Sequence, residues 1–168
     1  MRGPMVNKIR IVGPVGSGKS TLARKMAQAR GIPMFTLDDM VWSRGPNGDT
    51  RNTNDVRDSL LNDVVQQASW IIEGTHIGWS DQSFECADMI IFLNPRVPVR
   101  VYRFSKRFFR QKRGLEPTSY IPTWTIYGRM FKWTYQYETI FKHQVRSIML
   151  KSQTESIEIH DGKELGVF

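Results

Sequence analysis

One octapeptide constrains the fold of this 168-residue chain more than any other feature: GPVGSGKS, residues 13–20. It fits the pattern G-x-x-x-x-G-K-[ST], a phosphate-binding loop that joins a buried strand to a helix. The required context is present, because an apolar run precedes the motif and an apolar helical face follows it. The apolar residues are Ile9, Ile11 and Val12 before the motif and Leu22, Ala23, Met26 and Ala27 after it. The alternative is an ordinary glycine-rich turn.

Each position of this loop has a physical function in anion binding. Glycines let successive backbone N–H groups point inward, and the following helix directs its positive end at the same place. Lys19 is expected to contact β- and γ-phosphates, and the Ser20 hydroxyl to complete the shell of a Mg²⁺ ion. The predicted nucleotide-binding residues of the loop are Gly13, Pro14, Val15, Gly16, Ser17, Gly18, Lys19, Ser20 and Thr21.

Composition favours a single soluble domain spanning residues 1–168. The chain is 40% hydrophobic and 24% charged, and its longest apolar run, residues 89–93, is far too short to cross a bilayer. Cys86 is the only cysteine, so no internal disulfide can form. We therefore expect a cytoplasmic protein without a membrane partner.

The net charge of +8 comes from one segment, residues 96–113, which holds eight Lys or Arg and no acid. As a helix, this segment would place arginines on one face and an apolar stripe beside them. The arginines are Arg96, Arg100, Arg103, Arg107 and Arg110, and the stripe is Val97, Val101, Phe104 and Phe108. Three interpretations stay open: cations for phosphoryl transfer, with Arg103 and Arg107 as catalytic candidates; a solvated face; and a nucleic-acid patch, which is less favoured.

Strand and helix signals alternate along the chain, which predicts an α/β fold with a parallel sheet. Strands are expected at 8–13, 33–37, 70–74, 88–93 and 156–160, and helices at 18–30, 55–68, 97–113 and 128–150. Residues 43–54 and 114–125 are expected to be loops. In such sheets, ligands bind at the carboxyl ends of the strands.

Carboxylates follow two of the predicted strands at this edge. Asp38 is the candidate to accept the proton of an acceptor hydroxyl or to help hold Mg²⁺, whereas Asp39 could simply cap the next helix. Glu73 could hold a Mg²⁺-bound water or contact the acceptor; the alternative is a carboxylate bonded to backbone. Gly74 would let a ligand approach the backbone.

Other candidates for acceptor binding lie in residues 40–69. Trp42 lies just past a strand end, and Arg51 belongs to the polar segment that could clamp the acceptor. The predicted substrate-binding residues are thus Asp38, Trp42, Arg51, Glu73 and Gly74, and the predicted metal contacts are Ser20 and Glu73.

The ordered set GPVGSGKST, LDDMVW, WIIEGTH and ADMIIFLN, followed by an arginine-rich helix, resembles the adenylate-kinase-related P-loop kinases. It is most similar to the group of DNA topology modulation proteins of the FlaR type. The resemblance implies a three-layer sandwich with a five-stranded parallel sheet in the order 2-3-1-4-5. It also implies a helical lid over residues 96–133, the cofactors ATP and Mg²⁺, and adenine contacts at Gly162 and Lys163.

The resemblance implies transfer of the γ-phosphoryl of ATP to a small polar acceptor, such as a nucleoside, a nucleotide or a related metabolite. After the third strand, Glu73-Gly74-Thr75-His76-Ile77 lacks the proline and arginine of the adenylate kinase signature, which weighs against a nucleoside monophosphate. The alternatives are an ATP-binding nucleic-acid-binding protein that uses the basic helix and a polynucleotide 5′-hydroxyl kinase.

Overall fold

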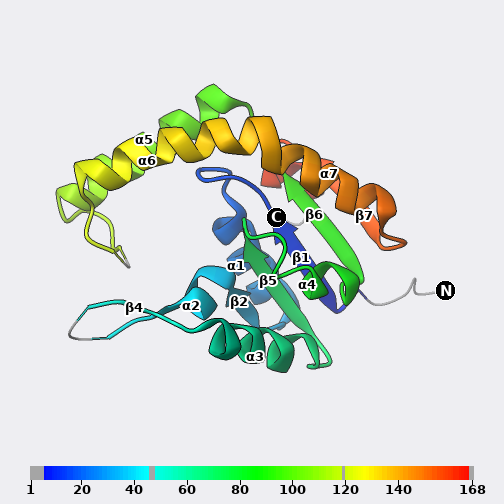
Figure 1. Cartoon of the computed structure of the whole chain (residues 1–168). Coiled ribbons are helices and arrows are strands. Elements are labelled where there is room, and N and C mark those ends of the chain that lie inside the picture. Colours follow the sequence, from blue (N-terminus) through cyan, green and yellow to red (C-terminus); the bar gives the residue numbers. More distant parts are fainter. Residues whose placement is uncertain (1–5, 46–47, 119, 167–168) are drawn as a thin grey trace.

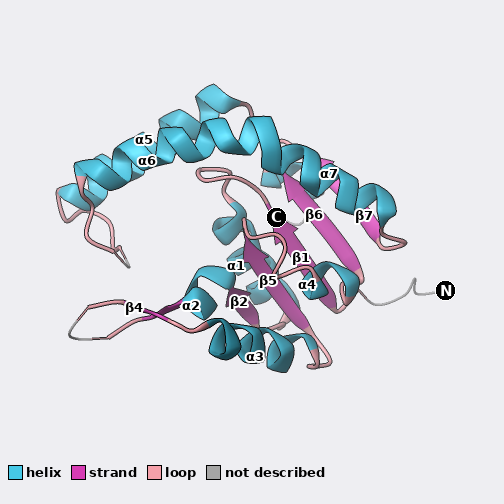
Figure 2. Ribbon diagram, in the orientation of Figure 1, coloured by secondary structure: helices cyan, strands magenta, loops and turns pink. Residues whose placement is uncertain are grey.

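A parallel five-stranded sheet forms the centre of the computed structural model, which describes residues 6–45, 48–118 and 120–166 (Figures 1 and 2). Its strands are β1 (Lys8–Val12), β2 (Met34–Thr36), β5 (Trp70–Gly74), β6 (Met89–Leu93) and β7 (Glu155–Ile159). The spatial order is β2-β5-β1-β6-β7. Numbered among themselves along the chain, these strands take the order 2-3-1-4-5, so the predicted α/β fold class is confirmed.

Helices cover both faces of the sheet because its strands are apolar on both sides, as in most parallel sheets. Along β1, Ile9 and Ile11 face one layer and Val12 the other. Helix α1 (Lys19–Arg30) covers the first face. The second face is covered by α2 (Leu37–Val41), α3 (Asn54–Val65), α4 (Gln82–Glu85), the π-helical turn η1 (Tyr137–Phe141) and α7 (Lys142–Lys151).

Two long helices, α5 (Val97–Lys112) and α6 (Trp124–Gln136), form an arm that passes over the sheet (Figure 1). The predicted apolar stripe of the basic helix joins them. The ring of Phe108 stacks on Tyr127 at 4.6 Å between centroids, and Phe104 meets Phe131 edge-on at 5.1 Å. The arm is thus held together by aromatic packing. Among the described residues, no helix is long and apolar enough to cross a membrane.

Several boundaries differ from those expected from sequence. The long C-terminal helix starts at Trp124, four residues early, because the Thr123 side chain accepts from the Ile126 N–H at 3.2 Å. The loop expected at 43–54 contains a small hairpin, β3 (Trp42–Ser43) and β4 (Thr50–Arg51), although residues 46 and 47 lie outside the described residues. The strand expected to end at residue 37 stops at Thr36.

Asp38 and Asp39 consequently lie in the first turn of α2 rather than at the end of a strand. Negative side chains are favourable there, because the positive end of the helix dipole is close. A short 3₁₀ helix, η2 (Gly162–Leu165), follows β7 at the carboxyl edge of the sheet.

Gly74 ends β5 in a space where a neighbouring side chain occupies the position of a Cβ atom. A Cβ atom at Gly74 would lie 2.8 Å from the Cβ of Leu37, a residue with no exposed surface. The missing side chain therefore allows α2 to pack on β5.

We predict that Gly74→Ala lowers the free energy of unfolding by about 1–3 kcal/mol, since the core at Leu37 has no room for another methyl group. Gly128→Ala is the matched control. Gly128 lies inside α6 with nothing near its Cβ position, so this change should raise stability by about 0.5–1 kcal/mol. Urea unfolding measures both; equal effects would contradict the packing argument.

Candidate functional site

The glycine loop (residues 13–20), which joins β1 to α1, packs between the end of β6 and the start of α5. A Cβ at Gly13 would lie 2.4 Å from the carbonyl oxygen of Leu93, at the end of β6. A Cβ at Gly16 would lie 2.7 Å from the carbonyl oxygen of Arg100 in α5. Gly16 also has a φ of 74°, and Gly18 one of 96°, in the region that favours glycine. The loop conformation therefore depends on residues without side chains.

At the start of α1, Lys19 and Ser20 point back over the loop. Lys19 Nζ donates to the carbonyl oxygen of Pro14 at 3.4 Å, and the Ser20 hydroxyl donates to Oε1 of Glu73 at 2.9 Å. Glu73 is 3% exposed, and its Oε2 has no hydrogen-bond partner among the described residues. A hydroxyl beside a buried carboxylate with a spare oxygen fits a Mg²⁺ ion or its water ligands.

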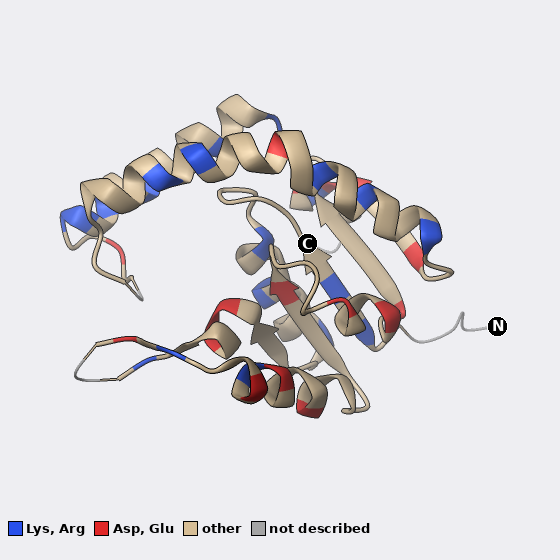
Figure 3. Cartoon of the chain, in the orientation of Figure 1, with Lys and Arg blue, Asp and Glu red and all other residues tan. Residues whose placement is uncertain are grey.

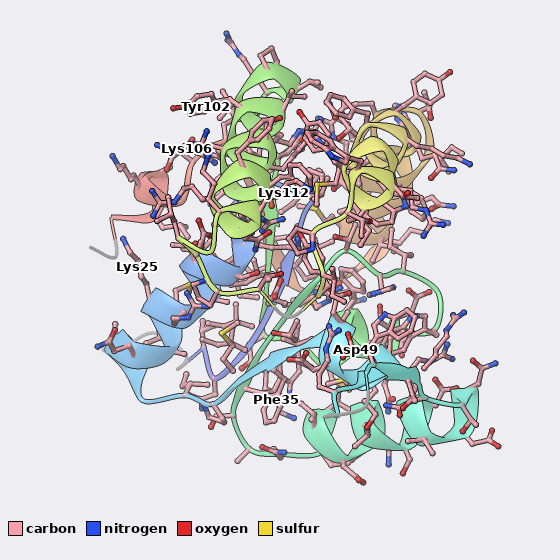
Figure 4. The ribbon with its side chains drawn as sticks, turned by 90° about the vertical axis from the view of Figure 1, so that its left-hand side faces the viewer. Lys25, Phe35, Asp49, Tyr102, Lys106 and Lys112 are labelled. Atoms are coloured by element: carbon pink, nitrogen blue, oxygen red, sulfur yellow. The ribbon has the colours of Figure 1, made fainter. Side chains whose placement is uncertain are left out.

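A cavity of about 670 Å³ lies between the loop, α1, α5 and η2. Figure 3 shows the basic residues along the arm, and Figure 4 shows Lys25 on α1 below Tyr102 and Lys106 on α5. Two acids, Glu116 and Asp161, line the cavity together with seven basic residues. The basic residues are Lys19, Lys25, Arg103, Lys106, Arg107, Arg110 and Lys163. The cavity thus suits a large, highly charged anion.

Arg103 connects the arm, the loop and η2. Its Nη1 donates to the carbonyl oxygen of Ser17 at 3.0 Å, and its Nη2 bonds to Oδ2 of Asp161 at 3.2 Å. Asp161 caps η2 by accepting from the Lys163 N–H at 3.1 Å. This backbone hydrogen bond, together with the charge of Arg103, lowers the pKa of Asp161. Gly162 and Lys163 therefore line the same cavity as the loop.

Arg107 also lines the cavity, and its Nε is buried without a hydrogen-bond partner among the described residues. Arg100 does not belong to this set. It has no exposed surface, pairs with Glu138 of η1, and lies 5.7 Å from the ring of Tyr137. The expectation of one continuous arginine face is thus wrong at Arg100, because η1 packs over it. The start of α5 packs against the loop, because the Arg100 carbonyl oxygen lies at Gly16 and Arg103 bonds to Ser17.

Asp38 lies on the other side of the loop from the arm, beside His76. Nε2 of His76 is 3.0 Å from Oδ1 of Asp38, and the Asp38 side chain is 65% exposed. This hydrogen bond, aided by the nearby charges of Lys19 and Arg44, lowers the pKa of Asp38. Asp38 is therefore an ionised carboxylate near the loop lysine.

The segment that carries His76 is held from beneath by a buried arginine. Arg10 of β1 has no exposed surface, and its Nη2 donates to the His76 carbonyl oxygen at 3.1 Å. The Ser80 hydroxyl donates to the same oxygen at 2.7 Å, and the Thr75 hydroxyl donates to the Gly13 carbonyl oxygen at 2.8 Å. Burial lowers the pKa of Arg10 to about 10. These bonds couple the position of His76 to the glycine loop.

The structure does not bring every predicted residue to the cavity. Asp38, Glu73 and Gly74 lie outside its lining, and Trp42 and Arg51 face each other in register on the β3–β4 hairpin. Trp42 is 39% exposed. Trp42, Arg51 and Asp38 therefore stay predictions for acceptor binding, separate from the cavity.

Sequence reasoning missed several residues at the site. Thr75 and His76 directly follow β5 at the carboxyl edge of the sheet, so strand position could have identified them. Lys25 and Lys106 line the cavity from helices, and Arg10 acts from inside the core. No local pattern indicates these three residues.

Comparison with known proteins supports the architecture. No protein-family model and no curated protein matches this sequence. Among solved structures, shikimate kinase from Acinetobacter baumannii in complex with shikimate is 15% identical, covers 96% of this chain and 89% of its own, and has a TM-score of 0.58. The chain has the fold of the P-loop kinases. Shikimate kinase from Bacteroides thetaiotaomicron is 14% identical over 94% of this chain and 88% of its own, with a TM-score of 0.55. A Janibacter sugar kinase is 18% identical over 95% of this chain and 87% of its own, at a TM-score of 0.49.

We predict that His76→Ala raises the pKa of Asp38 toward its ordinary value, because the carboxylate loses the donor that stabilises its charged form. A lowered pKa stabilises the fold above the ordinary pKa of Asp, and this contribution disappears as pH falls through the lowered value. The stability difference between wild type and His76→Ala should therefore shrink toward low pH.

NMR titration of the Asp38 carboxyl measures its pKa. Urea unfolding between pH 2 and 7, about the range that brackets the pKa of an Asp carboxyl, measures how the free energy of unfolding depends on pH. His143→Ala, at an exposed position of α7, is the control and should leave both unchanged. An unchanged Asp38 titration in His76→Ala would show that the hydrogen bond does not act on it.

Proposed function

We propose that this protein is an ATP-dependent phosphotransferase that moves the γ-phosphoryl group to a hydroxyl of a small polar acceptor. The acceptor is a nucleoside, a nucleotide or a related metabolite. The observation that supports this most is the arrangement around Lys19: a basic cavity on one side of the glycine loop and the ionised carboxylate of Asp38 on the other. Membership of the DNA topology modulation group is part of the proposal and rests on the sequence motifs.

The donor occupies the cavity in this proposal. Backbone N–H groups of residues 16–21 and the Lys19 ammonium bind its phosphates, and Gly162 and Lys163 border its base. Arg103 and Arg107 face the same space from α5, where guanidinium groups can stabilise the charge that develops during transfer. ATP supplies the phosphoryl group. Ser20 and Glu73 would hold Mg²⁺, which neutralises phosphate charge.

The acceptor approaches from the side of Asp38. This carboxylate takes the proton of the acceptor hydroxyl, while the hydroxyl oxygen forms a new bond to the γ-phosphorus. The bond from the γ-phosphorus to the bridging oxygen breaks, and ADP leaves with its electron pair. His76 orients Asp38 and keeps it ionised, because it donates to Oδ1.

A nucleic-acid-binding function, or a polynucleotide 5′-hydroxyl kinase activity, is the less favoured alternative. It would need arginines of α5 on the outer surface. Arg100 is buried, Arg103 bonds to the glycine loop, and Arg107 lines the cavity. Arg100 is therefore covered by η1, and Arg103 and Arg107 face the proposed nucleotide.

We predict that Lys19→Ala slows phosphoryl transfer by about 100-fold or more, because the Lys19 ammonium is the positive charge that the loop contributes to the phosphoryl group being transferred. The assay follows label from γ-labelled ATP and Mg²⁺ to nucleosides, nucleoside monophosphates, sugars, shikimate and 5′-hydroxyl DNA. Label on one acceptor class that disappears in the variant would establish the activity. Saturable ATP binding without transfer to any acceptor would contradict it.

A second prediction concerns the donor cavity. Arg107→Ala should weaken ATP binding by about tenfold, because a guanidinium charge on the cavity lining is lost. Lys112→Ala is the matched control, since Lys112 lies on the same helix outside the lining. Calorimetric titration with a non-hydrolysable ATP analogue measures both; equal losses would indicate only a general charge effect.

A further inference from the structure

Charge is divided sharply between the two parts of the molecule that meet at the glycine loop. The segment from Leu37 to Asp81 contains eight Asp or Glu, three Arg and no Lys, a net charge of −5 in a chain of net charge +8. Figure 3 shows acids on α2 and α3 and basic residues along the arm formed by α5 and α6. Figure 4 shows Asp49 below Lys106 and Lys112 of α5.

Two of the three arginines in this segment are already neutralised within it. Arg44 pairs with Asp49 and lies 3.9 Å from Asp39. Arg57 pairs with Asp58 at 2.6 Å, lies 4.5 Å over the ring of Trp79, and has a side chain only 14% exposed. The third is Arg51, on the exposed hairpin. The segment from Leu37 to Asp81, which carries Asp38, therefore offers little positive charge to a bound anion.

The carboxylates nearest the point of transfer bond directly to His76 and Ser20 rather than to Lys or Arg, although the charges of Lys19 and Arg44 lie near Asp38. Asp38 bonds to His76, and its pKa is lowered, so it carries a full negative charge at neutral pH. Glu73 bonds to the neutral Ser20 hydroxyl, and its buried Oε2 has no partner among the described residues. An acceptor hydroxyl that reaches Asp38 therefore enters a region of negative potential.

We infer that the acceptor is an alcohol with no phosphate or carboxylate of its own, either neutral or carrying an ammonium group. This inference rests on the proposed phosphotransferase activity. An anionic acceptor would meet Asp38, Asp39 and Glu73, and like charges repel. The nearby cations are already engaged, because Arg44 pairs with Asp49 and Lys19 bonds to the glycine loop. A neutral or cationic alcohol avoids this repulsion. It also cannot compete with ATP for the basic cavity, so the charge pattern separates donor from acceptor.

The first test compares matched acceptors in the labelled-ATP assay. The pairs are adenosine with adenosine monophosphate, ribose with ribose 5-phosphate, and glucosamine with glucosamine 6-phosphate. The member without an anionic group should have a kcat/KM at least about tenfold higher. Preference for the phosphorylated members would overturn the inference while leaving the kinase activity intact. No transfer to any acceptor, with ATP still bound, would instead refute the proposed function.

A second test detects the electrostatic exclusion without phosphoryl transfer. Ribose 5-phosphate is titrated into the complex with a non-hydrolysable ATP analogue for wild type, Asp39→Lys and Asp63→Lys. Asp39 is 67% exposed beside Asp38, whereas Asp63 lies exposed near the end of α3, at the amino edge of the sheet. The affinity for ribose 5-phosphate should rise about fivefold or more in Asp39→Lys and stay unchanged in Asp63→Lys. Tight binding to wild type, or an equal effect of both reversals, would overturn the inference.

Discussion

Close backbone packing at Gly13 and Gly16 is the constraint on which the rest of the site depends. These residues let the loop lie against the carbonyl oxygens of Leu93 and Arg100, which belong to the end of β6 and the start of α5. A strand of the sheet, the glycine loop and the arm are thereby fixed together at one point. The cavity exists because the arm is held over the loop, and Arg103 adds a hydrogen bond to the Ser17 carbonyl.

A second set of contacts extends this arrangement to the opposite side of the loop. Arg10, buried in the central strand, binds the carbonyl oxygen of His76, and Thr75 binds that of Gly13. The His76 ring in turn contacts Asp38 on α2. A displacement of the loop would thus move the carboxylate as well, so the glycine loop, His76 and Asp38 are positioned by one connected network.

Local sequence was sufficient to predict the glycine loop, the five strands and the basic helix, because each is encoded within a short span of chain. The strand–loop–helix pattern carries its own glycines, lysine and serine, and the buried strands are continuous apolar runs. The prediction was wrong at Arg100, and the sequence did not reveal the packing at Gly74. In both, the neighbour that decides the environment, Leu37 or Glu138, is more than thirty residues away in sequence.

The sequence by itself therefore determined the fold class, the glycine loop and the concentration of positive charge in one helix. Only the tertiary structure decided which arginines face the cavity, because η1 covers Arg100 while Arg103 and Arg107 remain beside the loop. It also decided that His76 holds Asp38, a pair brought together by β2 lying beside β5. Residues distant in sequence acquire their environment through strand pairing and helix packing, and no local periodicity records those contacts.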